Sequence, residues 1–323
     1  MLRRSLLIVV FAAFVAGCNG GSASPPPFFT GTFVPTPTPS PSPTPTPVVQ
    51  HLYVGNDNAS GEVLQYTLPI TATSTSNFTL TSPSVLAMAL DAAGNLATAQ
   101  LSGPLRFFPA PLSGASTASA TFANGAAPNT LGMAFVPSGT NAGDLWTGSA
   151  VSQVYRFTPP FTNASTPATT LTPPGATTTE GVAFDPALNM YITNAPGGAP
   201  SNVYVYAPPY TGVPVQTAGV AGSYRKDIAS ATQLFVAAPI ALPGRIDVYT
   251  LPITAASVPA FAITTGVSTP EAVALDSAGN LYVGNLNNHT VTVYAPPFSA
   301  ASAPTVTLTA PAGFAIFAIA IGK

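Results

Sequence analysis

The sequence predicts an all-β protein in which six repeated sheets close into a ring. Three observations predict this fold: an aromatic residue followed three positions later by proline recurs six times, each repeat holds β-like runs, and the two ends of the repeat region are complementary. The motif spans residues 66–69, 108–111, 157–160, 206–209, 249–252 and 294–297, at spacings of 42, 49, 49, 43 and 45 residues. Repeats of this length are typical of small sheet units that bury their apolar faces against their neighbours.

The repeat is clearest between residues 271 and 308. Runs rich in β-branched and aromatic residues at 271–276, 281–284, 291–294 and 305–308 are separated by glycine, asparagine and proline, which predicts four strands. Related copies of the first one or two strands occur at 86–96, 131–146, 180–191, 224–235 and 317–322. The aromatic-x-x-proline motif falls at the end of the third strand, where proline stops strand pairing and turns the chain toward the fourth.

The ends of the repeat region predict that the ring is closed. The region opens in mid-repeat, with residues 51–55, 62–67 and 78–81 as second, third and fourth strands, and it finishes on a lone first strand at 314–321. That last strand completes the sheet begun by the first three, which removes exposed sheet edges. We therefore predict a six-bladed β-propeller of four-stranded antiparallel blades over residues 48–323.

The repeated pattern (V/A)ALDxxGNLYV, seen in the segments 86–96 and 271–283, resembles NHL repeats and the related six-bladed propellers that include the gluconolactonase-like proteins. The resemblance covers essentially all of residues 50–323. It implies a propeller fold and does not imply any one activity. Asp91, Asp185 and Asp276 stand where the chain turns from the first strand to the second, and we interpret them as turn-forming residues rather than as catalytic groups or metal ligands.

The first 17 residues predict a signal peptide. Arg3 and Arg4 precede an uncharged apolar run at 6–14, which is too short to span a bilayer as a folded helix. The run leads to Val-Ala-Gly-Cys at 15–18, which resembles the lipobox of bacterial lipoproteins and implies lipidation of Cys18. Cys18 is the only cysteine, so an intramolecular disulfide is excluded. The alternative is an ordinary secretory signal with an incidental cysteine.

Residues 18–47 predict a tether between the lipid and the propeller. This segment is rich in proline, threonine and serine, and proline alternates with them from residue 36 to residue 47. Alternating proline fixes φ and removes backbone donors, which favours an extended polyproline II spacer. Asn19, in place of the aspartate that retains such lipoproteins at the inner membrane, favours the outer membrane. The predicted location is the cell envelope, at the periplasmic face of the outer membrane or at the cell surface.

The charge of the chain argues against nucleic acid as a partner. Loss of Arg3 and Arg4 with the signal peptide leaves six basic against ten acidic residues, a net charge of 6 − 10 = −4. Binding of nucleic acid requires a basic stripe that neutralises phosphates, and the sequence holds none.

Charged residues of the fourth repeat mark a candidate site. Alignment places one residue of each repeat at an equivalent position, the start of the inner strand: Leu86, Leu131, Glu180, Tyr224, Glu271 and Phe317. The alternate positions that follow are small in five repeats, but the fourth repeat has Arg225 and Asp227 there, with Lys226 between them. Because charges near a narrow axis are costly unless they are paired or solvated, the departure indicates a special role.

We predict a site for a small polar ligand or a cation at the mouth of the central channel. The predicted site residues are Glu180, Tyr224, Arg225, Asp227 and Glu271. Two structural alternatives stay open: an internal ion-pair plug, with Arg225 bridging the two glutamates, or a misaligned fourth repeat whose charges lie on the surface.

Polar residues of the loops between second and third strands form a second candidate surface on the same face. Their amides have the hydrogen-bonding capacity to bind carbohydrate or peptide, although turns demand the same residue types. These residues are Asn56, Asp57, Asn58, Asn194, Asn285, Asn287, Asn288 and His289. Neither His289 nor His51 has a second ligand at a spacing that a metal site needs.

The sequence thus predicts a non-catalytic binding or scaffolding module, anchored to a membrane and displayed on a stalk. None of the common hydrolase, metalloprotease, phosphate-loop or dinucleotide motifs occurs. We predict no cofactor, and an extracytoplasmic protein, a carbohydrate or a small molecule as the partner. The alternative is a metal-dependent lactonase-like hydrolase, implied by the resemblance, in which Glu180 and Glu271 hold a divalent cation. Trp146, the single tryptophan, is predicted to be a core residue.

Overall fold

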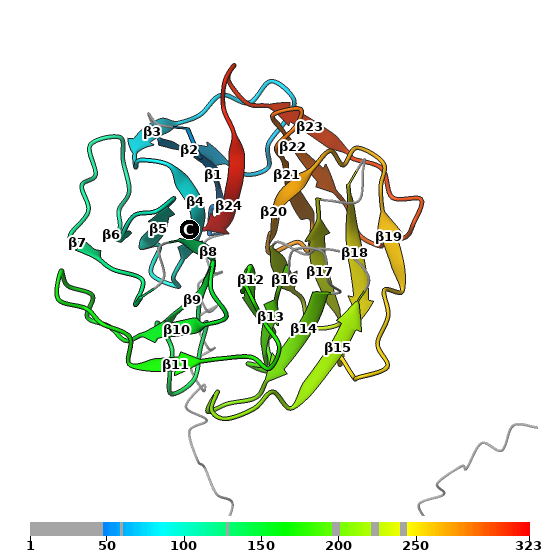
Figure 1. Ribbon diagram of the computed structural model, residues 1–323. Helices are drawn as coiled ribbons and strands as arrows, with labels where there is room; N and C mark the ends of the chain where they lie inside the picture. The colour runs from blue at the N-terminus through cyan, green and yellow to red at the C-terminus, as the bar shows by residue number, and fades with distance from the viewer. Residues whose placement is uncertain (1–47, 59–60, 127–128, 196–200, 221–225, 240–243) are drawn as a thin grey trace, which may run out of the picture. The chain divides into compact units, whose positions relative to one another are not determined.

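The computed structural model describes residues 48–323 except 59–60, 127–128, 196–200, 221–225 and 240–243. The chain divides into Met1–Thr46 and one compact unit, Pro47–Lys323. The described part of this unit contains 24 strands, arranged as six four-stranded antiparallel sheets around a common axis (Figure 1). The predicted six-bladed all-β propeller is confirmed.

The blades follow one another around the ring in chain order. Blade 1, from the axis outward, contains β4 (Val85–Leu90), β5 (Leu96–Gln100), β6 (Leu105–Phe108) and β7 (Ala120–Phe122). Blade 2 contains β8 (Thr130–Phe135), β9 (Leu145–Ser149), β10 (Val154–Phe157) and β11 (Thr169–Leu171). Blade 3 contains β12 (Gly181–Phe184), β13 (Met190–Thr193), β14 (Ser201–Tyr206) and β15 (Gln216–Val220).

The second half of the ring has the same plan. Blade 4 contains β16 (Asp227–Ala229), β17 (Gln233–Ala238), β18 (Arg245–Thr250) and β19 (Phe261–Ile263). Blade 5 contains β20 (Pro270–Leu275), β21 (Leu281–Asn285), β22 (Thr290–Tyr294) and β23 (Val306–Thr309). Blade 6 contains β24 (Ile316–Gly322), β1 (His51–Asn56), β2 (Glu62–Thr67) and β3 (Phe78–Thr81).

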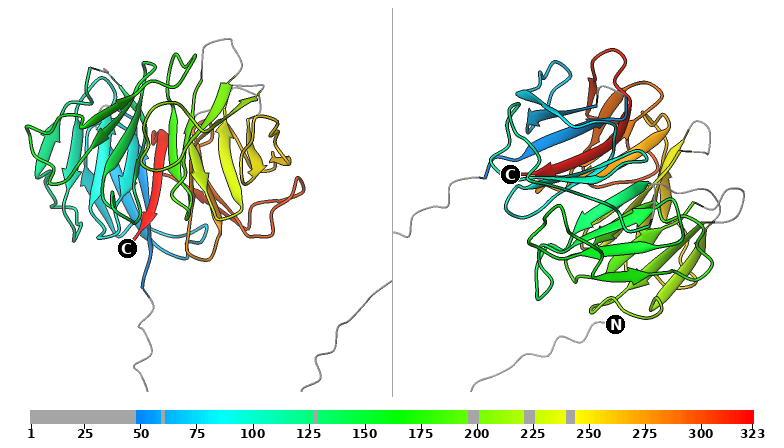
Figure 2. Two further views of the ribbon diagram at one scale, coloured as in Figure 1. Left: turned by 90° about the horizontal axis from the view of Figure 1, so that it is seen from below. Right: turned by 60° about the vertical axis from the view of Figure 1, so that its left-hand side comes forward.

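Blade 6 closes the ring as predicted. The C-terminal strand β24 pairs antiparallel with β1, with Leu52 opposite Ile321 and Val54 opposite Ile319. His51 lies opposite Gly322, so the start of the first strand and the end of the chain share one face of the ring, as Figure 2 shows. That face, which we call the turn face, also carries the turns between the first and second strands of blades 1 to 5.

The repeated aspartates form turns, as the sequence indicated. In blade 5 the Asp276 carboxylate accepts the backbone N–H of Asn280 at 2.8 Å and the side-chain amide of Asn280 at 2.8 Å. Asp91 makes the same pair of bonds to Asn95, at 2.9 and 2.7 Å. Since these hydrogen bonds satisfy the turn's own backbone, they give the aspartates a structural role.

Trp146 lies in the core between blades 2 and 3. Its side chain is fully buried, and its ring meets that of Tyr210 edge-on, with centroids 5.7 Å apart. The prediction of a core role is confirmed.

The first turn of blade 4 is one residue shorter than that of blade 5. In blade 4 the turn closes through the Ser230 N–H, which donates to the Gln233 carbonyl at 2.8 Å. In blade 5 the corresponding bond runs from Asp276 to Asn280, one residue further along the chain.

The shorter turn shifts the register of β16 by one residue. Asp227 faces Val236 across the ladder, as Val273 faces Val283 in blade 5. The prediction that Asp227 occupies one of the small-residue positions near the axis is therefore wrong by one residue, because the alignment assumed turns of equal length.

Asp276→Ala should lower the free energy of unfolding by about 1–2 kcal/mol, since the turn loses hydrogen bonds to a charged acceptor. Urea denaturation checks this, with Asp91→Ala as the matched variant in blade 1. Loss of divalent-cation-dependent stabilisation in either variant would contradict the structural role.

Candidate functional site

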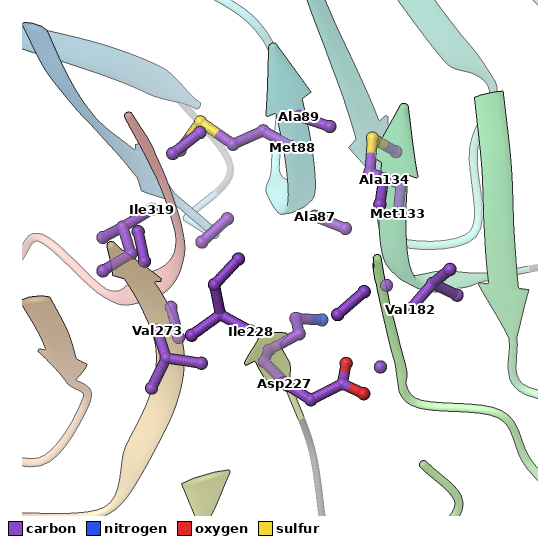
Figure 3. Close-up of a pocket in the computed structure, with 18 of the residues that line it drawn as sticks. Ala87, Met88, Ala89, Met133, Ala134, Val182, Asp227, Ile228, Val273 and Ile319 are labelled. Atoms are coloured by element: carbon purple, nitrogen blue, oxygen red, sulfur yellow. The ribbon is translucent and has the colours of Figure 1, made fainter. Parts of the chain in front are cut away.

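The six innermost strands, β4, β8, β12, β16, β20 and β24, surround a central cavity of about 220 Å³ (Figure 3). Its lining continues along these strands to their last residues, Leu90, Phe135, Phe184 and Leu275 among them. The cavity therefore extends toward the turn face of the ring.

Strand pairing places the lining residues in levels, with one residue from each blade at a level. The middle level, which we call the central ring, consists of Met88, Met133, Val182, Asp227, Val273 and Ile319. The level nearer the starts of the strands consists of Ala87, Gly132, Gly181, Lys226, Ala272 and Ala318. Each level contains five apolar or small residues and one charged residue. Both charged residues, Lys226 and Asp227, come from blade 4, and among the described lining residues they alone carry charge.

Asp227 is buried without a hydrogen-bonding partner. The residue is 7% exposed, both of its carboxyl oxygens are buried, and neither has a donor within hydrogen-bonding distance among the described residues. The contrast with other buried aspartates is clear: Asp144 pairs with Arg156 at 2.7 Å, and Asp247 pairs with Arg245 at 2.7 Å. A buried carboxyl group normally has such partners, because leaving one unsatisfied costs about 1–3 kcal/mol.

A glycine on the neighbouring strand makes room for this carboxyl group. A Cβ added at Gly181 of β12 would collide with Oδ1 of Asp227, and it would lie 2.5 Å from the hydroxyl oxygen of Thr193. The side chain of Asp227 thus occupies a gap between blades 3 and 4 that a larger residue at position 181 would fill.

Burial raises the pKa of Asp227 well above its usual range. The backbone N–H of the same residue and the positive charge of Lys226 act in the opposite direction but are weaker. The cause is desolvation, which disfavours the charged form of a carboxyl group.

Two of the other predicted site residues, Glu180 and Glu271, do not line the cavity with Asp227. Glu180 directly precedes β12 and Glu271 is the second residue of β20, and both are buried. Neither belongs to the described residues that line the cavity. Tyr224 and Arg225 lie outside the described residues, so the proposed ion-pair plug stays a prediction. The alignment gave Lys226 no role beyond its place between Arg225 and Asp227. In the structure Lys226 lines the cavity.

The asparagines at the ends of the second strands have structural partners. Asn56 accepts the backbone N–H of Ala315 at 2.9 Å, and Asn285 accepts that of Ser268 at 2.9 Å. His289 is tied through Nδ1 to the carbonyl of Phe314, 2.8 Å away. These hydrogen bonds join the loops after the second strands to the segments that lead into the first strands. They give Asn56, Asn285 and His289 a structural role.

The described residues contain neither a cluster suited to a metal ion nor a helix suited to cross a membrane. No group of three or more His, Cys, Asp or Glu side chains in this part of the chain is arranged to hold a metal ion. The described residues also contain no helix that is long and apolar enough to cross a membrane.

The comparisons with known proteins define a class by fold. No family model and no curated protein matches the chain. A structure solved as a nidogen/laminin complex is similar over 85% of this chain and 98% of that one, with a TM-score of 0.62 and 14% identity. A Bacteroides caccae protein of unknown function covers 85% and 100%, with a TM-score of 0.60 and 11% identity. The β-propeller domain of Myceliophteria thermophila Cps50 (Swd1) covers 81% and 83%, with a TM-score of 0.55 and 12% identity. The protein is a β-propeller.

Asp227→Asn should stabilise the protein, increasingly so as pH rises. A carboxyl group with a raised pKa in the folded state holds its proton more tightly there than in the unfolded chain. The contribution of this proton to the free energy of unfolding is therefore complete below about pH 4. It is lost as pH rises toward the raised pKa of Asp227 in the folded state. Urea denaturation of wild type and variant between pH 4 and pH 8 should show a widening gap. A gap that narrows with pH would contradict the buried neutral acid, and Glu62→Gln controls for net charge.

Gly181→Ala should lower the free energy of unfolding by about 1–3 kcal/mol, because the new methyl group overpacks the gap beside Asp227. The cost should be smaller when Asp227→Ala is also present, since the two side chains compete for one space. Equal costs in both backgrounds would show that the carboxyl group does not depend on Gly181.

Proposed function

We propose that the protein is a non-catalytic binding or scaffolding module of the cell envelope, anchored through lipid on Cys18. The observation that supports binding most directly is the central cavity. Its described lining residues are small or apolar except for Lys226 and Asp227, and ligand sites typically combine an apolar lining with a few polar groups. The NHL-like character of the repeats agrees with this function and belongs to the same proposal.

The anchor comes from the sequence before the propeller. Signal peptide 1–17, lipidated Cys18 and the proline-rich tether to residue 47 act as one unit of export and attachment. Each acyl CH₂ buried in lipid contributes about 0.8 kcal/mol, so two or more chains hold a protein stably. The tether joins the propeller at the start of β1, on the turn face, which leaves the opposite face of the ring as the one remote from the point of attachment.

A protein is the partner that we favour for the scaffolding role. Two of the similar structures were solved as assemblies, the nidogen/laminin complex and a mitotic checkpoint complex. Both structures resemble this chain in fold alone. They support a role in binding another protein and do not identify that protein.

Photo-crosslinking in the intact envelope of the native host tests the scaffolding role. A crosslinking residue at Asn287, on the face remote from the tether, should give a discrete adduct, and one at Ser277, on the turn face, should not. Both positions are exposed or partly exposed in the described structure. Absence of an adduct from Asn287, or the same adduct from both positions, would contradict the proposal. Hydrolysis of lactones that depends on a divalent cation and is lost in Glu180→Gln and Glu271→Gln would instead establish the lactonase-like alternative.

Cys18→Ser should abolish incorporation of an alkyne-labelled fatty acid and release the protein from the membrane fraction. The propeller itself should keep its thermal unfolding temperature, because Cys18 lies outside the compact unit. Continued labelling of the serine variant would exclude Cys18 as the lipidated residue.

A further inference from the structure

The outermost strand of each blade is a sheet edge, and contacts at blades 1 and 6 show how the next blade covers it. In blade 2 the loop between the third and fourth strands spans 158–168, and its Asn163 accepts the backbone N–H of Thr121 in β7 of blade 1 at 2.8 Å. In blade 1 the corresponding loop comes close to blade 6, because a Cβ added at Gly114 would lie 3.1 Å from the carbonyl oxygen of Thr79 in β3. Such loops cover backbone groups with which another strand could otherwise pair.

Five of the six loops between third and fourth strands share one length and one internal hydrogen bond. Each returns its first N–H to the third strand eight residues after the proline of the repeated motif, at residues 77, 119, 168, 260 and 305. In each, a backbone N–H donates to the hydroxyl group of a serine three residues later, at 2.8 or 2.9 Å. The blade 3 loop returns at Val215, after six residues, and it has Pro214 three residues after Thr211 where the other loops have that serine.

The shortened loop does not cover the edge of blade 2 in the same way. β11 is the outermost strand of that blade, and its Thr170 holds the ladder position that Thr121 holds in blade 1, so its N–H and C=O groups also face outward (Figure 1). Counted from the proline of the motif, Gly212 stands where the blade 2 loop has Asn163, and it has no side chain to accept the Thr170 N–H. A Cβ added at Gly212 would meet no atom within 4 Å.

The same loop exposes apolar side chains beside this edge. Val213 is 74% exposed and Val215 is 57% exposed. At the place of Val215 the other five loops have alanine, asparagine, serine or threonine. Tyr210, three residues before Val213, shares a core cluster with Leu171 of β11, so the loop lies next to that strand. We call Thr170, Val213 and Val215 the uncapped rim.

The uncapped rim is short and uncharged, which favours a folded partner of the same shape. Pro167 and Pro173 stand three residues on either side of Thr170, and proline has no N–H to pair, so the edge offers few hydrogen bonds. A flexible peptide would lose conformational entropy on pairing with so short an edge and would gain little in return. A second copy of the rim is already ordered. In antiparallel pairing about a twofold axis, its Thr170 presents both the acceptor and the donor that the first Thr170 needs.

We propose that two copies of the protein pair through the uncapped rim. The N–H of Thr170 in each copy donates to the Thr170 carbonyl of the other copy, and the exposed valines of both copies are covered at the contact. Attachment of both copies to one membrane, as proposed above, raises their local concentration, so a contact of modest size is sufficient. Self-pairing goes beyond the proposed function, because a partner bound on the face remote from the tether does not require it.

Oxidative crosslinking of Thr170→Cys in the intact envelope of the native host tests the pairing. Residues directly opposite each other in an antiparallel hydrogen-bonded pair have Cα atoms about 5.5 Å apart, which is within the range that a disulfide bridges. We expect a covalent dimer on a non-reducing gel. Thr121→Cys changes the same strand position in blade 1, where Asn163 covers the edge, and should give no dimer. Wild type reports any crosslinking through Cys18.

Matched valine variants test the apolar part of the contact. Val213→Asp should lower the dimer yield of Thr170→Cys by about tenfold or more, because the pairing would bring like charges of the two copies together. Val258→Asp should leave the yield unchanged, since Val258 is 71% exposed in the full-length loop of blade 4. Both variants should keep the thermal unfolding temperature of the parent protein, so a lost dimer is distinguishable from a misfolded propeller.

A Thr170→Cys protein that stays monomeric after oxidation would overturn the proposal, as would equal dimer yields from Thr170→Cys and Thr121→Cys. A disulfide from Thr170→Cys to a different protein would also overturn self-pairing and would assign the uncapped rim to that protein. Neither outcome would change the crosslinking result expected at Asn287.

Discussion

The structure depends on the closure of the ring by the pairing of β24 with β1. A four-stranded sheet has two faces to bury, and each blade buries them only against the blades on either side. Without the pairing of Val54 with Ile319 and its neighbours, blades 5 and 6 would expose the apolar cluster that contains Leu52, Ile316 and Phe314. Closure therefore fixes the position of all six inner strands, and with them the width and the lining of the central cavity.

Closure also makes the axis the most restrictive place in the molecule. Six strands converge there, so alanine and glycine recur on one side of five of the inner strands and compact apolar residues on the other, with blade 4 as the exception. A carboxyl group near the axis loses its hydration and gains no hydrogen-bond donor among the described residues. Its charged form is therefore disfavoured. Gly181 of blade 3 leaves the space that the carboxyl group of Asp227 in blade 4 occupies, so the arrangement depends on both blades. Blade 4 is therefore the place where the sequence departs from the pattern that the other five inner strands share.

The sequence predicted the fold well because its signals are local and repeated. The aromatic-x-x-proline motif, the aspartate turns and the complementary ends each depend on neighbouring residues, and each is repeated often enough to set a period. Strand pairing and ring closure followed from them, and so did the role of Trp146. The residue-level site was harder to predict. A single missing residue in the turn from Ser230 to Gln233 moved Asp227 to the opposite set of strand positions, because side chains alternate along a strand.

The same alternation explains which residues were missed. Met88, Met133 and Ile319 form the apolar wall of the cavity, but in the sequence they read as ordinary core positions between small residues. Comparing turn lengths between repeats, rather than motif spacings alone, would have placed Lys226 and Asp227 correctly. Spacing alone could not show that Glu180 and Glu271 do not line the cavity, since the depth of the cavity along the axis depends on side-chain packing.

Infrared difference spectroscopy of wild type against Asp227→Asn tests the central claim most directly, because it observes the carboxyl group itself. We predict that the protonated carboxyl band of Asp227 persists to a higher pH than the carboxyl bands of the other aspartates. Loss of the Asp227 band in the same pH range as the others would contradict a carboxyl group that is buried without a partner.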